Sequence, residues 1–277
     1  MLLAIDVGNT NILFALIDGD RIAWRWRIAT DGKRTADEYA VWLNHLMMME
    51  GIERSEIHDV VIASVVPQTL FNLRGLARRF ADVEPLVVGS PGVNYGMPIR
   101  LPNPAEVGAD RIVNAVAAHA LWPGDLIIID FGTATTFDVV SAKGEYEGGV
   151  IAPGINLSMD ALYQAAAKLP RIAVEPPEQG LGVIGKNTVH AMQSGVFWGY
   201  VGLIEGLVAR IQAEIGRPVT VIATGGLAPL FSRHTGVIQH VDPDLMIKGL
   251  VRIHARNHGP KRAAYHAANS KRPDFED

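Results

Sequence analysis

The sequence predicts an α/β protein built from two similar lobes, and three observations support this prediction. Short apolar runs typical of buried strands alternate with segments of helical periodicity along most of the chain. One strand–turn–strand pattern occurs twice, at residues 3–11 and again at residues 127–135. The composition, 48% apolar and 19% charged, is that of a globular rather than a disordered chain. We therefore expect two lobes, each a mixed sheet flanked by helices, with a cleft between them.

The first elements along the chain are strands followed by a helix. Three apolar or alternating runs predict an antiparallel meander with a tight turn before its last strand. These runs cover residues 2–7, 12–17 and 22–28. Thr35 and Glu38 have the spacing of a capping box, which predicts a helix that runs on to about Gly51.

Strands and helices continue to alternate along the rest of the chain. The expected strands cover residues 59–66, 85–88, 126–131, 136–140 and 219–223, and the expected helices residues 67–80, 105–121, 187–215 and 243–255. The pattern predicts an N-terminal lobe at residues 1–121, a C-terminal lobe at 122–257 and a mobile polar tail at 258–277.

The composition excludes several classes of protein. There are no cysteines, which excludes disulfide frameworks and thiol nucleophiles. The net charge of −4 argues against a nucleic-acid partner. No apolar run approaches the ~18 residues that a membrane span needs, so we expect no membrane partner. The apolar start of the chain stops at Asp6 without a basic region before it, so we expect no signal peptide and a cytoplasmic protein.

The repeated hairpins have the parts of a phosphate-binding site. Gly8 and Gly132 allow tight turns in which successive backbone N–H groups converge on an anion. Asp6 and Asp130 stand at strand ends, where a carboxylate can hold a metal ion beside phosphates. A plain hairpin turn with an Asx hydrogen bond is the better interpretation of either copy alone. The pair, followed by a third glycine turn at residues 224–226, favours the phosphate site.

Asp110 and Arg111 form a second candidate pair near the start of a predicted helix. The carboxylate could accept a proton from a substrate hydroxyl, and the guanidinium could bind a substrate carboxylate in a bidentate manner. The alternative is an acid at a helix start, favoured by the helix dipole, beside a surface arginine. On the residues alone, this structural alternative is the stronger one.

Taken in order, the motifs resemble those of the type III pantothenate kinases, within the actin, sugar-kinase and Hsp70 superfamily. The resemblance covers about residues 1–257. It is carried by Asp6-Val7-Gly8-Asn9-Thr10, Asn94-Tyr95-Gly96, Gly108-Ala109-Asp110-Arg111, Asp130-Phe131-Gly132-Thr133-Ala134-Thr135, Gly148-Gly149-Val150-Ile151-Ala152-Pro153-Gly154, Met192-Gln193-Ser194-Gly195 and Ala223-Thr224-Gly225-Gly226.

The resemblance implies an enzyme that uses ATP to phosphorylate the primary hydroxyl of pantothenate, the first step of coenzyme A synthesis. Asp110 would be the catalytic proton acceptor. The residues implied for ATP are Asp6, Val7, Gly8, Asn9, Thr10, Asn11, Ile12, Leu13 and Thr133. The residues implied for pantothenate are Tyr95, Gly108, Ala109, Asp110, Arg111 and Thr188.

The resemblance also implies cations and a partner. Asp130 would hold a monovalent cation, K⁺ or NH₄⁺, and Asp6 would hold Mg²⁺ or a similar divalent ion through water. Members of this family are homodimers, so a second copy of the chain is the expected partner. Two alternatives stay open: a kinase for another small alcohol or sugar, and a non-catalytic nucleotide-binding regulator.

Overall fold

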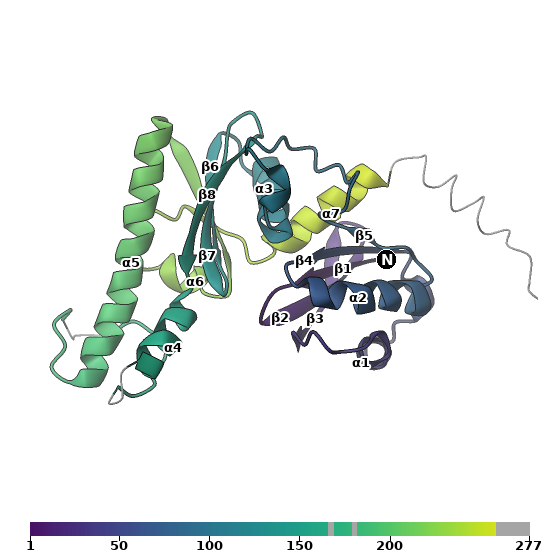
Figure 1. The fold of residues 1–277 in the computed structure, drawn as a ribbon, viewed down its shortest axis with the longest axis horizontal. Coiled ribbons are helices and arrows are strands. Elements are labelled where there is room, and N and C mark those ends of the chain that lie inside the picture. Colours follow the sequence, from purple (N-terminus) through teal and green to yellow (C-terminus); the bar gives the residue numbers. More distant parts are fainter. Residues whose placement is uncertain (166–168, 179–181, 259–277) are drawn as a thin grey trace, which may run out of the picture. The chain divides into compact units, whose positions relative to one another are not determined.

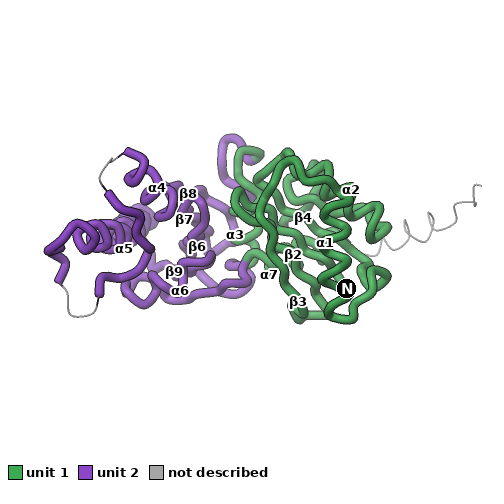
Figure 2. The backbone as a smooth tube through the Cα atoms, turned by 90° about the horizontal axis from the view of Figure 1, so that it is seen from below, with its two compact units in different colours: residues 1–97, 105–117, 246–277 green, residues 98–104, 118–245 purple. Residues whose placement is uncertain are grey.

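The structure, a computed structural model, describes residues 1–165, 169–178 and 182–258 (Figure 1). They divide into two compact units, coloured separately in Figure 2. Unit 1 holds residues 1–97, 105–117 and 246–258, and unit 2 holds residues 98–104 and the described part of 118–245. The predicted mobile tail, apart from its first residue His258, lies outside the described residues.

The sheet of unit 1 has five strands in the order β3-β2-β1-β4-β5. They are β1 (Leu2–Val7), β2 (Asn11–Asp18), β3 (Arg21–Ala29), β4 (Asp59–Ser64) and β5 (Leu86–Val87). The first three form the expected antiparallel meander, whereas β4 and β5 extend the sheet parallel to β1. Because β1 is the central strand, Asp6 near its end is carried by the middle of the sheet.

Two helices pack on each other and on this sheet. Helix α1 (Ala36–Met49) begins with the predicted capping box, in which the Thr35 and Glu38 side chains each accept a hydrogen bond from the other residue's backbone N–H. Helix α2 (Pro67–Phe80) has its proline in the first turn, where no N–H is needed. A 3₁₀ turn, η1 (Arg54–Glu56), precedes β4. Buried apolar side chains of α1, α2 and the strands form one core.

Most of two further helices belongs to unit 1. Helix α3 (Ala109–Leu121) contributes its residues up to 117, and helix α7 (Leu245–Asn257) contributes its residues from 246 onward. They pack closely, because a Cβ atom on Gly249 would lie 2.1 Å from the Val113 carbonyl oxygen. The predicted start of α3 at residue 105 is wrong by four residues. A separate 3₁₀ turn, η2 (Pro104–Glu106), comes first, and the helix begins only after Gly108, a residue that disfavours continuous helix.

The sheet of unit 2 has the order β10-β9-β6-β7-β8. Its strands are β6 (Asp125–Phe131), β7 (Ala134–Val140), β8 (Tyr146–Pro153), β9 (Val219–Gly225) and β10 (His240–Val241). Strands β6, β7 and β8 form an antiparallel meander, and β9 and β10 run parallel to β6. This is the topology of unit 1: a meander whose first strand is central, followed by two parallel strands. The sequence repeat is therefore a structural repeat.

The described part of unit 2 also holds the helices α4 (Ile155–Ala165), α5 (Thr188–Ile215) and the short α6 (Ala228–Phe231). The side chain of Asn187 caps α5 by accepting the backbone N–H of His190 at 2.9 Å. One face of α5 is buried in the unit's core together with β6 and β9.

The sequence patterns did not predict β8, β10, α4 or α6. Strand β8 contains Gly148 and Gly149 and ends at Pro153, all residues that weaken a strand pattern. It forms nevertheless, because β7 offers a complete antiparallel partner along its length. The remaining predicted elements match the structure to within a few residues at each end.

Among the described residues, no helix combines the length and the apolar character that crossing a membrane requires.

The compact units do not follow the predicted lobe boundary everywhere, since most of α7 belongs to unit 1. The lobes at 1–121 and 122–257 therefore stay a prediction, distinct from the units defined by packing.

Candidate active site

The first glycine hairpin joins the central strand of unit 1 to its antiparallel neighbour. The backbone N–H of Gly8 donates to the carbonyl of Asn11 at 3.0 Å, which closes the turn. Thr30, directly after β3, holds the turn from outside: its hydroxyl donates to the Gly8 carbonyl at 2.6 Å, and its N–H donates to the Thr10 carbonyl at 2.9 Å. Asn9, Thr10 and Asn11 are exposed at the tip, so their polar groups can reach a ligand.

The second hairpin has the same construction with a shorter turn. The N–H of Gly132 donates to the Ala134 carbonyl at 3.1 Å, and Thr133 is exposed. Gly154 packs against this turn so closely that a Cβ atom there would lie 2.3 Å from the Thr133 carbonyl oxygen. The turn is therefore held rigidly, as a site that binds phosphate through backbone groups requires.

Asp130 lies against the third glycine turn, which follows the parallel neighbour strand β9. Asp130 and Thr224 pair across the two strands. Gly225 has a φ of +90°, and a Cβ atom there would lie 2.8 Å from the Asp130 carboxylate. The structure thus brings together two motifs separated by about a third of the chain, and only glycine fits at residue 225.

Tyr200 of α5 contacts the second hairpin from the protein interior. Its hydroxyl forms a hydrogen bond with that of Thr135 and donates to the Pro153 carbonyl at 3.3 Å. Burial raises the pKa of the Tyr200 hydroxyl, so the group stays neutral and continues to donate. Nothing in the sequence pattern singled out Tyr200.

At the start of α3 the structure brings Gly108, Asp110 and Arg111 together. Asp110 is half-buried, and its Oδ1 atom accepts the backbone N–H of Arg111 at 2.8 Å. The carboxylate also lies over Gly108, where an added Cβ atom would be 2.5 Å from Oδ1. Glycine at residue 108 therefore leaves the space that the Asp110 side chain occupies.

Tyr95 lies on a loop that helix α7 holds in place. The Tyr95 hydroxyl oxygen accepts the N–H of Gly89 at 3.1 Å. The side chain of Asn257 accepts the N–H of Asn94 and donates to the Asn94 carbonyl, both at 2.9 Å. Sequence reasoning missed Asn257, because nothing local distinguishes it from any other polar residue at a helix end.

The predicted residues fall into two groups by unit. Residues 6–13, Tyr95 and residues 108–111 belong to unit 1, whereas Asp130, Thr133 and Thr188 belong to unit 2. Thr188 is the exposed first residue of α5, directly after the capping Asn187.

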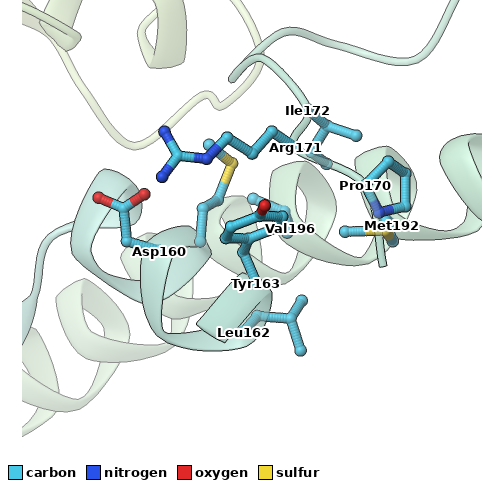
Figure 3. Close-up of a pocket in the computed structure, with 9 residues that line it drawn as sticks. Asp160, Leu162, Tyr163, Pro170, Arg171, Ile172, Met192 and Val196 are labelled. Atoms are coloured by element: carbon cyan, nitrogen blue, oxygen red, sulfur yellow. The ribbon is translucent and has the colours of Figure 1, made fainter. Parts of the chain in front are cut away.

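A cavity of about 110 Å³ lies in unit 2 between α4, α5 and the segment at residues 170–172 (Figure 3). The Arg171 guanidinium lies 4.8 Å from the centre of the Tyr163 ring, a cation–π contact. None of the predicted site residues lines this cavity, so it forms no part of the candidate site.

The donor groups at the two strand ends suit hard cations. Asp6 and Asp130 each supply carboxylate oxygens, which are the ligands that Mg²⁺ and alkali ions prefer over nitrogen or sulfur. Both side chains are half-buried, so an ion there would be partly shielded from water. The residues present therefore fit the cations that the resemblance implies.

Comparison with solved structures agrees with the fold. A structure from Campylobacter jejuni, described as a Baf family transcriptional activator, has a TM-score of 0.60 at 18% identity and covers 92% of this chain and 98% of that one. The ethanolamine utilization protein EutJ from Carboxydothermus hydrogenoformans has a TM-score of 0.52 at 16% identity, covering 91% of this chain and 88% of that one. At such identities the likeness extends to the fold alone, and it confirms the predicted fold class.

Sequence comparison is more specific. The type III pantothenate kinase family matches residues 2–210. The protein of that name from Paramagnetospirillum magneticum is 60% identical over 262 residues, which are 95% of this chain and all of the relative. The one from Rhizorhabdus wittichii is 62% identical over 90% of this chain and 96% of its own length. The chain therefore belongs to the type III pantothenate kinase family.

Proposed function

We propose that this protein transfers the γ-phosphoryl group of ATP to the primary hydroxyl of pantothenate, which begins coenzyme A synthesis. The observation that supports this most directly is the arrangement at the start of α3. A half-buried carboxylate, Asp110, stands beside Arg111, and its orientation is fixed by a hydrogen bond from the adjacent backbone N–H. A hydroxyl acceptor with a carboxylate of its own needs such a pair, one group for the proton and one for the charge.

Asp110 has a limited task in this mechanism. Phosphoryl transfer depends mainly on positioning and on neutralising charge, with little bond formation before the leaving group departs. Asp110 orients the attacking hydroxyl and takes its proton late. Arg111 binds the carboxylate of pantothenate, and the Tyr95 hydroxyl and Thr188 supply further polar contacts to the substrate.

The glycine hairpins bind the nucleotide. Backbone N–H groups and exposed side chains of residues 6–13 and Thr133 contact the phosphates of ATP. Asp6 would hold Mg²⁺ through water, and Asp130 would hold K⁺ or NH₄⁺. When bound, these cations neutralise negative charge on the phosphates.

We also propose a cytoplasmic homodimer, since ATP is available in that compartment and α5 has a face suited to pairing. Four glycines, Gly195, Gly199, Gly202 and Gly206, follow each other at three- and four-residue spacing and so share one face of the helix. Added Cβ atoms at the first three would have no atom of another described segment within 4 Å. Among the described residues this face is therefore open, and it permits close helix approach.

A kinase for another small alcohol is the second candidate, because a fold does not fix its acceptor. A coupled assay of ADP release with a panel of acceptor alcohols tests both candidates. We expect pantothenate to be phosphorylated far faster than sugars or other alcohols, and only when K⁺ or NH₄⁺ is present. Preference for another acceptor would support the second candidate, and no turnover of any acceptor would favour a nucleotide-binding regulator.

A further inference from the structure

A cluster of ionisable side chains in unit 1 contains none of the predicted site residues. Asp59 is the first residue of β4, and it pairs with Leu2 at the start of the parallel strand β1. Asp6 lies four residues further along β1, about 13 Å from Leu2 at the usual rise of a strand. Asp59 therefore lies at the end of the strands opposite to the glycine hairpin.

Two histidines of the last helix meet Asp59. His254 is in the last turn of α7, and His258 directly follows the helix. Their Nε2 atoms lie 3.6 Å and 2.5 Å from the Asp59 Oδ1 atom. The two imidazole rings lie 3.6 Å apart, centre to centre, at an angle of 30°. Each residue offers one ligand atom, and the three atoms all lie within 4.8 Å of one another.

Burial makes this cluster unusual. His254 is 9% exposed, and its Nε2 atom has no hydrogen-bond partner among the described residues although it is shielded from water. Burying a polar atom without a partner is destabilising, so such an atom generally marks a missing ligand or a functional role. Burial alone would raise the pKa of the Asp59 carboxyl, but the two histidines outweigh it and hold the pKa below its ordinary value.

We propose that Asp59, His254 and His258 form a binding site for a divalent transition metal of the Zn²⁺ type. Two histidines four residues apart point to one side of a helix, a spacing that metal sites use. Two imidazoles and one carboxylate suit Zn²⁺, whereas Mg²⁺ and Ca²⁺ favour oxygen ligands alone. Three protein ligands leave the fourth tetrahedral position to water.

The distances fit this assignment with one adjustment. Ligand atoms about 2.1 Å from a tetrahedral metal lie about 3.4 Å from one another. The separation between Asp59 and His254, 3.6 Å, is already close to this value. The 2.5 Å contact between Asp59 and His258 must lengthen as the metal replaces the hydrogen bond. The backbone N–H of His258 donates to the His254 carbonyl at 3.0 Å, so the helical turn continues to His258 and the adjustment falls on its side chain.

A metal here would join the start of β4 to the end of α7, two segments almost two hundred residues apart in the chain. It would stabilise the folded protein, because the unfolded chain does not hold the three ligands together. The site acts on structure, and none of its three ligands is among the residues proposed for the phosphoryl transfer.

The test uses the full-length protein, stripped with a chelator and titrated with Zn²⁺ against a chromophoric competitor. We expect one Zn²⁺ per chain and a rise in melting temperature. Co²⁺ should give the visible absorption of a tetrahedral site with nitrogen and oxygen ligands. His254→Gln, His258→Gln and Asp59→Asn should each weaken Zn²⁺ binding at least about 100-fold, more than the loss of an outer-shell group causes.

His45→Gln is the matched control, because His45 is an exposed histidine of α1 outside the cluster. It should leave affinity and stoichiometry unchanged. Asp59→Asn and His258→Gln change half-buried side chains, so they keep the test decisive if the buried His254→Gln variant does not fold. Zn²⁺ binding that is absent, or equally strong in the cluster variants and the control, would overturn the proposal and leave a histidine–aspartate ion pair only.

Discussion

Asn257, the last residue of α7, exchanges two hydrogen bonds of 2.9 Å with the backbone of Asn94. The same amide donates to the Ile253 carbonyl at 2.7 Å, which fixes its orientation on the helix. Gly96, with a φ of +66°, lies under the Arg256 guanidinium, so the residue before Asn257 contacts the loop as well. The loop that carries Tyr95 is thus held by the end of the chain's last helix.

Asn257→Leu removes both hydrogen bonds to this loop. We expect the KM for pantothenate to rise about 5- to 30-fold, the equivalent of one or two lost hydrogen bonds, because Tyr95 is no longer held in place. The KM for ATP should stay the same. Steady-state kinetics with each substrate varied in turn measures both, and Arg252→Gln, an exposed change on the same helix, is the control. An unchanged KM for pantothenate would show that the loop is positioned by other contacts.

Asp110→Asn keeps the shape of the side chain and its acceptor for the Arg111 N–H, but it removes the basic carboxylate. Turnover should fall by ~10²–10⁴, the usual effect of losing a general base. ATP affinity and melting temperature should change little. Single-turnover kinetics measures the rate of this variant, a binding titration its ATP affinity, and thermal unfolding its melting temperature. A folded variant within about tenfold of the parent turnover would assign Asp110 a purely structural role at the helix start.

Replacing K⁺ with Na⁺ should sharply reduce turnover, because ion size and ligand geometry decide which cation a carboxylate site accepts. Asp130→Asn should remove the difference between the two salts, since the charged ligand is gone. Initial rates at constant ionic strength measure both effects. Equal rates of the parent protein in K⁺ and Na⁺ would contradict a monovalent-cation site at Asp130.

Gly199→Arg should convert the dimer into a monomer, because the new side chain extends from the open glycine face of α5. The substitution has room within one chain, so folding should be retained. Glu214→Arg, an exposed change near the end of the same helix, should leave the dimer intact. Sedimentation velocity distinguishes the two species. A parent protein that is monomeric and active at assay concentration would exclude a functional dimer.

Because of the Asp125–Arg217 ion pair, the free energy of unfolding of unit 2 should fall as the pH is lowered into the acid range. Hydrogen bonds of 3.0 Å and 2.8 Å from the Arg217 guanidinium hold the pKa of the Asp125 carboxyl below its ordinary value. A depressed pKa contributes stability that is complete above the unfolded value of about 3.9 and is lost as the pH falls through the folded value. The parent should therefore lose more stability below about pH 4 than Asp125→Asn does.

Urea unfolding at a series of pH values measures this difference. Asp18→Asn, which changes an exposed carboxyl at the end of β2, should follow the parent curve. Parallel curves for the parent and Asp125→Asn would mean that the ion pair contributes no pH-dependent stability.

The sequence by itself determined the local structure and the family. Thr35 and Glu38 predict a helix start because the hydrogen bonds of a capping box join side chains to backbone N–H groups only three residues away. The repeated Asp-x-Gly hairpins are recognisable because turn chemistry and strand alternation are local properties. The same motifs were sufficient to identify the kinase family, and they predicted the duplicated topology of the two sheets.

Only the tertiary structure decided the contacts between segments far apart in the chain. No local pattern could indicate that Asn257 would bind the backbone of Asn94, that Gly225 would face Asp130, or that His254 would meet Asp59. Strand β8 likewise forms although its glycines disfavour a strand, because pairing with β7 satisfies its backbone hydrogen bonds. The physical reason is the same in each case. Hydrogen bonding and burial depend on which distant segments become neighbours in the folded chain, and the spacing of residues in the sequence does not show this.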